Sequence, residues 1–206
     1  MARLTRNESQ ARTRENLLTT ARTLFLTEGY AKTSLERVAE AAGYSKGAVY
    51  SNFHTKSELC LDVLALIHET KFAEVAAELA DGGTLDERVE RLRGWAERTL
   101  GDVGWTLLEF EFAVVARDDP RLQAALASNL ASVRGMVAAQ LQTLAQDLGI
   151  DLPLPAGDAA TMILGLGLGL GIQRAIDPSL SASLLSDTVR TLLRSRVPRP
   201  VGDLRE

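Results

Sequence analysis

The sequence predicts an all-α protein of about nine helices, and three observations support this fold class. Apolar residues recur at the three- and four-residue spacing of one helix face along most of the 206 residues. The strict alternation of a half-buried strand is absent outside one Leu-Gly run. Capping residues, glycines and Asp-Pro pairs interrupt the periodic segments where helices would begin and end.

The first helix is expected over about residues 9–27. Gly29 would end this helix as a left-handed C-cap. Five residues form one apolar stripe along it, namely Leu17, Leu18, Ala21, Leu24 and Phe25. Such a stripe predicts that one side of the helix packs against other elements.

Two short helices follow, separated by a tight turn. Thr33 is expected to cap the first of them and Glu36 to return the hydrogen bond, which together make a capping box. Gly43 ends this helix after about two and a half turns, and Ser45 caps the next one, over residues 46–53.

Six more helices are expected in the rest of the chain. A second capping box, Thr55 with Glu58, begins a long helix that reaches about Leu79. Asp-Pro pairs at 119–120 and 177–178 join a capping residue to a proline suited to the first helical turn. The later helices are expected over residues 85–100, 105–118, 120–148, 157–176 and 179–196.

Two short helices joined by a glycine-containing turn, after a longer supporting helix, have the form of a helix-turn-helix. In the second short helix Val49 and Phe53 would point inward. The outward face carries no acidic residue and consists of Lys46, Gly47, Tyr50, Ser51 and His54. Residues 1–56 hold nine Lys/Arg against five Asp/Glu, whereas residues 57–206 hold 14 against 22. A basic head on an acidic body indicates a polyanionic partner for the head, although a solvated face would show the same charge.

The chemistry of these side chains predicts a DNA-binding surface. Lys46 can reach a guanine edge or a phosphate, and hydroxyls at a helix N-terminus suit a phosphate oxygen. The predicted DNA-binding residues are Thr33, Ser34, Ser45, Lys46, Gly47, Ala48, Tyr50, Ser51, Asn52, His54 and Lys56.

Residues 14–63 resemble the DNA-binding domain of the TetR family of bacterial regulators. The resemblance rests on "A…LF…GY" in the first helix, "T…VA..AG" in the second, the "YSKGAVY" turn and the "NF..K..L" that follows. It implies that Tyr50 and Lys56 contact phosphates and that residues 45–51 form the reading surface. Ala48 and Asn52 depart from the family pattern, which often has Thr or Ser and His there.

The resemblance also implies the organisation and role of the whole chain. Residues 1–56 would be the helix-turn-helix domain and residues 57–206 a helical ligand-sensing and dimerisation domain. The implied function is a homodimeric repressor that binds a palindromic double-stranded DNA operator and is released by a small-molecule effector. A constitutive regulator, or one gated by a protein partner, remains an alternative.

The segment 159–172, AATMILGLGLGLGI, has no polar face, so a helix there would be buried all round. A dinucleotide-binding loop is disfavoured because no strand or G-x-G-x-x-G turn is present, and the run is too short for a membrane span. A plain core helix and a subunit interface both remain. We favour an interface with the last helix, formed by Leu164, Gly165, Leu168, Gly169, Ile172, Leu184, Leu185, Val189 and Leu192.

The effector pocket is less readable from sequence. The large apolar side chains of the body and one carboxylate are its candidates, namely Phe72, Trp95, Trp105, Leu108, Glu109, Phe110 and Phe112. Glu109 and Glu111 interrupt a very apolar helix and would either face the pocket or form solvated ion pairs. His68 reads as a helix-surface residue and Cys60 as a small buried apolar group.

Several classes of protein are disfavoured. A single cysteine and two histidines provide neither a disulfide nor a zinc set, so no metal or cofactor is expected. No nucleophile–base pair stands at a usable spacing, so we do not expect an enzyme. The polar N-terminal stretch lacks the apolar core of a signal peptide, and the expected location is the cytoplasm, on DNA, with no membrane partner.

Overall fold

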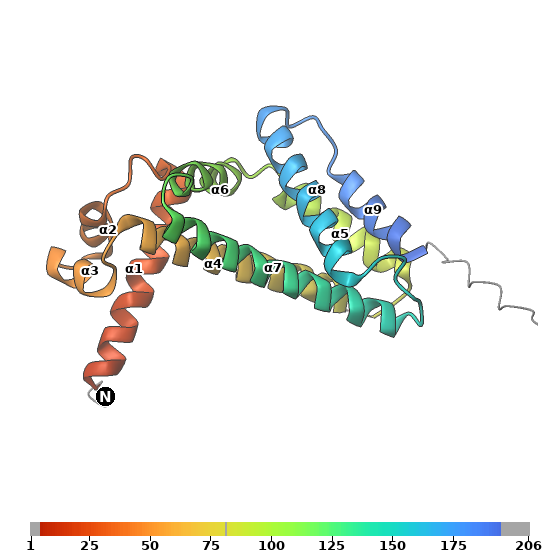
Figure 1. The fold of residues 1–206 in the computed structure, drawn as a ribbon, viewed down its shortest axis with the longest axis horizontal. Helices are drawn as coiled ribbons and strands as arrows, with labels where there is room; N and C mark the ends of the chain where they lie inside the picture. Colours follow the sequence, from red (N-terminus) through yellow and green to blue (C-terminus); the bar gives the residue numbers. More distant parts are fainter. Residues whose placement is uncertain (1–4, 81, 195–206) are drawn as a thin grey trace, which may run out of the picture. The chain divides into compact units, whose positions relative to one another are not determined.

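The computed structural model describes residues 5–80 and 82–194, and within them it contains nine helices and no strand (Figure 1). The prediction of an all-α chain is confirmed. The helices are α1 Arg6–Glu28, α2 Leu35–Ala42, α3 Lys46–Asn52, α4 Lys56–Ala80, α5 Leu85–Thr99, α6 Val103–Ala116, α7 Pro120–Asp147, α8 Ala156–Ile176 and α9 Ser183–Arg194.

The largest difference from the predicted boundaries is the start of α9. This helix begins at Ser183 and not at residue 179, because the residues before it form a turn held by the side chain of Asp177. The Asp177 carboxylate accepts hydrogen bonds from the backbone and the hydroxyl of Ser179, and Ala182 N–H donates to Glu97 of α5. Residues 195–196 of the predicted helix lie outside the described residues.

The chain packs as two compact units. Unit 1 consists of Met1–Lys71 and Asp102–Ala131, and unit 2 of Phe72–Gly101 and Ser132–Glu206. Helices α4 and α7 contribute residues to both units. The packing boundary therefore differs from the functional division at residues 56 and 57, which stays a prediction.

The core of unit 1 joins the three N-terminal helices to α4 and α6. Its largest fully buried side chains are contributed by five helices and by the residue after α3, and include Leu17, Phe25, Val38, Val49, Phe53, Leu59, Leu64, Ile67, Leu108 and Phe112. The inward-facing residues predicted from the helical spacing lie in this core. Helix α6, far along the sequence, completes it, so the short helices α2 and α3 do not fold on α1 alone.

The core of unit 2 lies mainly between α5 and α9. Leu92 and Ala96 of α5 pack in one cluster with Leu185, Val189 and Leu193 of α9. Arg174 of α8 anchors the end of α5, because its guanidinium pairs with Glu97 at 2.9 Å and donates to the Leu100 carbonyl at 2.8 Å. These contacts fix the C-terminal end of α5 against α8.

Helix α8 combines a length of 21 residues with a strongly apolar composition. By length and composition alone it could cross a membrane, a test that core helices of other proteins also pass. Only 22% of its apolar window is buried inside the chain. Burial all round, as the sequence predicts, is therefore not reached within one copy of the chain.

Gly104 provides a test of the packing of α6 on α1. A Cβ added to Gly104 would lie 2.3 Å from the backbone oxygen of Leu26, so the two helices would have to separate. We expect Gly104→Ala to lower the free energy of unfolding by about 1–3 kcal/mol through overpacking. Urea unfolding followed by circular dichroism measures this.

Gly135→Ala is the matched control, because Gly135 lies in α7 and a Cβ there meets nothing within 4 Å. Removing a helical glycine without a clash is expected to leave stability unchanged or raise it by about 0.5–1 kcal/mol. Equal effects of the two substitutions would contradict the close approach of α6 to α1.

Candidate nucleic-acid interface

The helix-turn-helix is held by backbone and capping contacts. Gly43 adopts a left-handed conformation, with φ of 75°, and ends α2 by donating to the Ala39 and Glu40 carbonyls. Ser45 caps α3, because its hydroxyl accepts from the Ala48 N–H at 3.2 Å. Val49 of α3 and Phe53 just after it are fully buried. The turn and the inward face of α3 thus agree with the sequence prediction.

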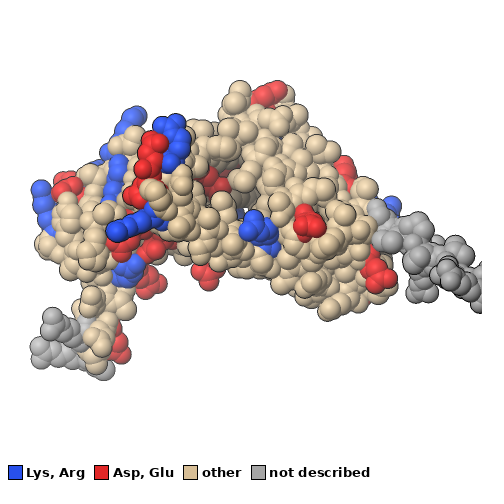
Figure 2. All heavy atoms as spheres, in the orientation of Figure 1, with Lys and Arg blue, Asp and Glu red and all other residues tan. Residues whose placement is uncertain are grey.

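The outward face of α3 is presented to solvent. The predicted reading residues Lys46, Gly47, Tyr50 and Ser51 are all exposed, as is His54 just after the helix. Ala48 is half-buried, which leaves part of its methyl group accessible. On the face drawn in Figure 2, most Lys and Arg side chains lie over helices of unit 1, with Asp and Glu among them.

Tyr50 is already engaged by an acidic residue. Its hydroxyl donates to the Glu36 carboxylate at 2.6 Å, although its side chain is 47% exposed. This hydrogen bond lowers the pKa of Glu36, and the same contact raises the pKa of Tyr50. The sequence pattern assigned Glu36 to a capping box, and its contact with the reading helix was missed.

Thr33 and Asn52, both predicted to contact DNA, face the protein. Thr33 is 1% exposed and its hydroxyl donates to the Gly29 carbonyl, so its side chain is not available to a phosphate. The cap of α2 is instead Ser34, whose hydroxyl accepts from Arg37 N–H. Asn52 is 9% exposed and its amide donates to the Ala48 carbonyl at 2.8 Å. Burial thus corrects both side-chain predictions and keeps Ser34 at the surface.

Lys56 holds the loop between α1 and α2. Its ammonium donates to the Tyr30 carbonyl at 3.0 Å and lies 4.1 Å from the centroid of the Tyr30 ring. Glu111 of α6 accepts from the Tyr30 N–H at 2.8 Å. The Lys56 ammonium, which the sequence predicts to contact a phosphate, is therefore partly buried against the protein. Lys56 is also the first residue of α4, so it lies in the first turn of that helix.

Arg14 of α1 positions the end of the reading helix. Its guanidinium donates to the Asn52 carbonyl at 2.5 Å, pairs with Asp62 of α4 and lies 4.2 Å from the Phe53 ring centroid. The sequence analysis missed this role. The partners are 38 and 48 residues away in the chain, so no local spacing connects them.

Several predicted pocket residues belong to the core of unit 1. Leu108 and Phe112 are 1% and 0% exposed within the core that supports the reading helix, so packing occupies them. Phe110 points to the surface at 39% exposed. Glu109 accepts from the Trp105 indole N–H at 2.8 Å and contacts His68 Nε2 at 2.5 Å.

His68 and Cys60 differ in how well the sequence predicted them. His68 is 8% exposed and not a surface residue, and its Nδ1 has no hydrogen-bond partner among the described residues. Cys60 is fully buried, as expected, and burial raises the pKa of its thiol. A protonated, inaccessible thiol is unreactive.

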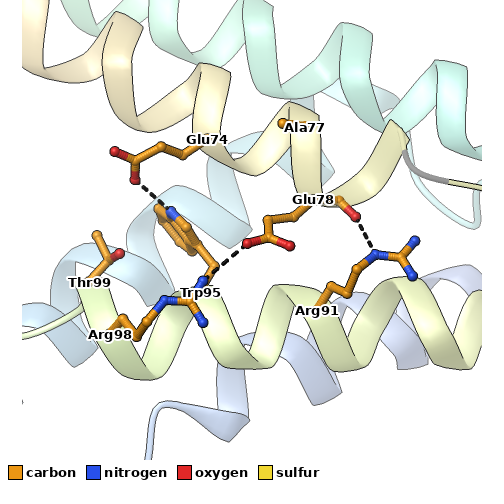
Figure 3. A pocket seen from close by; sticks show the side chains of 7 residues that line it. All are labelled: Glu74, Ala77, Glu78, Arg91, Trp95, Arg98 and Thr99. Atoms are coloured by element: carbon orange, nitrogen blue, oxygen red, sulfur yellow. Dashed lines mark hydrogen bonds and ion pairs between the residues drawn. The ribbon is translucent and has the colours of Figure 1, made fainter.

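Unit 2 contains a pocket of about 440 Å³ between α4 and α5 (Figure 3). Its lining residues are Glu74, Ala77, Glu78, Arg91, Trp95, Arg98 and Thr99. Trp95 is the predicted pocket residue found here, and its indole donates to Glu74 at 3.0 Å. Arg98 pairs with Glu78 at 3.0 Å, so charged groups already satisfy one another across the pocket. Phe72, also predicted, is half-buried on α4.

The predicted subunit-interface residues divide into two groups. Leu185, Val189 and Leu192 of α9 are at most 8% exposed and pack inside unit 2, which corrects their assignment. The others are exposed or half-buried on α8 and at the start of α9, namely Leu164, Gly165, Leu168, Gly169, Ile172 and Leu184. With Met162 and Ile176, which the sequence analysis did not include, they form an apolar surface.

The geometry of unit 1 is that of a helix-turn-helix, and known proteins share its sequence. A model described as bacterial regulatory proteins of the tetR family matches residues 17–63. The N-terminal helices of this chain are thus similar to those of TetR-family regulators.

The curated relatives are named as transcriptional regulators and not as enzymes. The chain is 40% identical over 70 residues to the HTH-type transcriptional regulator TtgR of Pseudomonas putida, covering 34% of this chain and 33% of that one. It is 32% identical over 111 residues to the repressor AcnR of Corynebacterium efficiens, covering 54% of each. The match thus spans about a third to a half of the length of these relatives.

Solved structures of low identity share the fold along most of the chain. A putative TetR-family regulator from Rhodococcus sp. has a TM-score of 0.72 and 22% identity, covering 89% of this chain and 99% of that one. FadR of Bacillus subtilis, solved with stearoyl-CoA, has a TM-score of 0.64 and 17% identity, covering 89% and 99%. A Saccharomonospora viridis regulator, solved with choline, has a TM-score of 0.64 and 22% identity, covering 92% and 100%.

The contacts of Arg14 lead to a prediction about stability. We expect Arg14→Met to lower the free energy of unfolding by about 1–2 kcal/mol, because the Asn52 carbonyl and the Phe53 ring lose their cationic partner. The exposed ion pair with Asp62 adds little to this. Arg14→Lys keeps the charge without the forked donor geometry, so its free energy of unfolding should lie between those of wild type and Arg14→Met.

Urea unfolding of the three proteins measures the effect, with Arg12→Met as control. Arg12 is exposed on the same helix, so its replacement should change stability by less than about 0.5 kcal/mol. If Arg14→Met behaves like Arg12→Met, Arg14 does not hold the end of α3.

Proposed function

We propose that this chain is a transcriptional regulator that reads double-stranded DNA with α3 in the major groove. The observation that carries the proposal is the exposed face of Lys46, Gly47, Tyr50 and Ser51 on a helix whose opposite face is fixed in the core. Such a helix enters the major groove with its polar side toward the base edges. The match of residues 17–63 to the tetR-family model supports the same role.

The proposed regulator acts as a homodimer on a palindromic operator. The apolar surface of α8 and α9 supports this, since Met162, Leu168, Ile176 and Leu184 are 37–82% exposed in the single chain. A contiguous apolar surface marks a site of association. Two reading helices related by two-fold symmetry would meet successive major grooves about 34–36 Å apart, which requires inverted half-sites.

A small-molecule effector is proposed to release the DNA. Structural neighbours were solved with stearoyl-CoA, lauroyl-CoA and choline, and one curated relative is named a repressor. In this chain the buried His68 Nδ1, which has no hydrogen-bond partner among the described residues, is a candidate contact for a polar group of such an effector. An effector would act by binding better to a state with misplaced half-sites. The proposed location is the cytoplasm.

Selection of bound duplexes from a random pool tests DNA reading. The recovered sequences should contain an inverted repeat, and affinity measured by fluorescence anisotropy should fall at least about a hundredfold between about 50 and about 200 mM salt. Lys46→Ala should lower the preference for the selected site by about 1–3 kcal/mol, because Lys46 contacts base edges. Binding that ignores salt, or no binding at micromolar protein, would refute the function.

Leu168→Glu tests the homodimer. A carboxylate on the exposed apolar face of α8 would lose its hydration in an interface. The dimer dissociation constant measured by sedimentation should therefore rise at least about a hundredfold. Val114→Glu is the control, because Val114 is 62% exposed on α6 and outside this surface. A monomeric wild-type protein, or equal sedimentation of all three, argues against the α8 interface.

A further inference from the structure

We propose that the Glu36 carboxylate occupies the place of a DNA phosphate on the free protein and so acts as an internal competitor that lowers affinity for all sequences. The inference rests on the proposed function. It assigns to α2 a residue that sets the affinity for DNA of any sequence. The contact between Glu36 and Tyr50 carries the argument.

Three groups expected to bind phosphate gather around this one carboxylate. The Tyr50 hydroxyl donates to it at 2.6 Å. The Tyr50 hydrogen bond lowers the pKa of Glu36 most, and Ser34, which caps α2, and Lys46, which begins α3, lower it further. Glu36 also lies in the first turn of α2, where the helix dipole favours a negative charge. The site around Glu36 is therefore arranged to hold an anion, and the anion it holds belongs to the protein.

A carboxylate and a phosphate accept the same hydrogen bonds, and a tyrosine hydroxyl has one proton to donate. When Tyr50 donates to a DNA phosphate, it must therefore leave Glu36. The carboxylate then stays close to the phosphate and repels it. Both effects weaken phosphate binding and neither depends on the base sequence.

The consequence is weaker binding to DNA of every sequence. Phosphate contacts provide the sequence-independent part of the affinity, and base contacts provide the discrimination. A residue that weakens the first part without touching the second lowers the affinity for operator and non-operator sites by the same factor, so their ratio is unchanged. An alternative role for Glu36 is purely structural, in which its hydrogen bond to Tyr50 keeps α2 and α3 at the correct angle.

The experiment measures binding of a fluorescent, mixed-sequence duplex about two turns long, since phosphate contacts need no operator. At about 50 mM salt, Glu36→Gln should bind about fivefold to tenfold more tightly than wild type, because glutamine keeps the size and the acceptor but removes the charge. The matched control is Glu40→Gln on the same helix, an exposed residue with no hydrogen bond to Tyr50. It should change affinity by less than about twofold.

Tyr50→Phe separates competition from a general charge effect. Without the hydroxyl there is nothing to exchange between carboxylate and phosphate and only the repulsion remains, so the gain from Glu36→Gln should be smaller in this background than with Tyr50 present. An equal gain in the two backgrounds would overturn the competition. A readout without DNA is the ionisation of Tyr50, followed by NMR of ¹³C-labelled tyrosine and assigned with Tyr50→Phe. In Glu36→Gln the pKa of Tyr50 should return toward its ordinary value.

The outcomes distinguish this inference from the proposed function. If wild type shows no salt-dependent binding of the duplex, both are wrong. If wild type binds but Glu36→Gln binds equally or more weakly, the DNA-binding function stands and the internal competitor is overturned in favour of the structural role. An equal gain in Glu40→Gln, or an unchanged Tyr50 pKa, overturns it as well.

Discussion

The position of the reading helix depends on one tyrosine. Tyr30, in the loop between α1 and α2, packs against the rings of Phe25 and Phe112, each 5.7 Å away between centroids. Its N–H donates to Glu111 and its carbonyl accepts from Lys56, so the backbone of a loop residue is satisfied by two charged side chains. Charge-assisted hydrogen bonds of this kind are stronger than neutral ones. The loop thus has little freedom, and α2 begins in a defined place.

The same tyrosine connects helices that are distant in sequence. Phe112 and Glu111 come from α6, and Lys56 comes from the first turn of α4. Arg14 provides a second connection, from α1 to the carbonyl end of α3 and to α4. Together these contacts fix both ends of the two short helices. Helices of seven and eight residues are not stable alone, so their geometry depends on these connections.

The interface is electrostatically mixed and not simply basic. Glu36 accepts from Tyr50, Glu28 pairs with Arg37 and Glu58 lies beside His54. Exposed ion pairs contribute little to stability, so here they matter mainly for how strongly the surface attracts an anion. A surface in which acidic groups already accept from the donors binds a polyanion less strongly than its positive charges suggest.

The amino-acid sequence alone determined the helices, the turn and the likeness of the N-terminal helices to TetR-family regulators. These depend on local signals, namely caps, glycines and the three- to four-residue spacing, and the outward positions of Lys46, Gly47, Tyr50 and Ser51 follow from the same periodicity. The proposed interface on α8 is predicted only in part by the sequence, because periodicity identifies an apolar face but does not show which apolar residues pack in the chain's own core.

Only the tertiary structure decided which polar groups are available. It buried Thr33 and Asn52, turned Lys56 toward Tyr30, and placed Glu36 on Tyr50 and Glu111 on the loop. The physical reason is that a hydrogen bond between side chains depends on where helices meet, and partners up to 81 residues apart leave no mark on local spacing. The sequence names the groups that could touch DNA, and packing determines which of them remain free to do so.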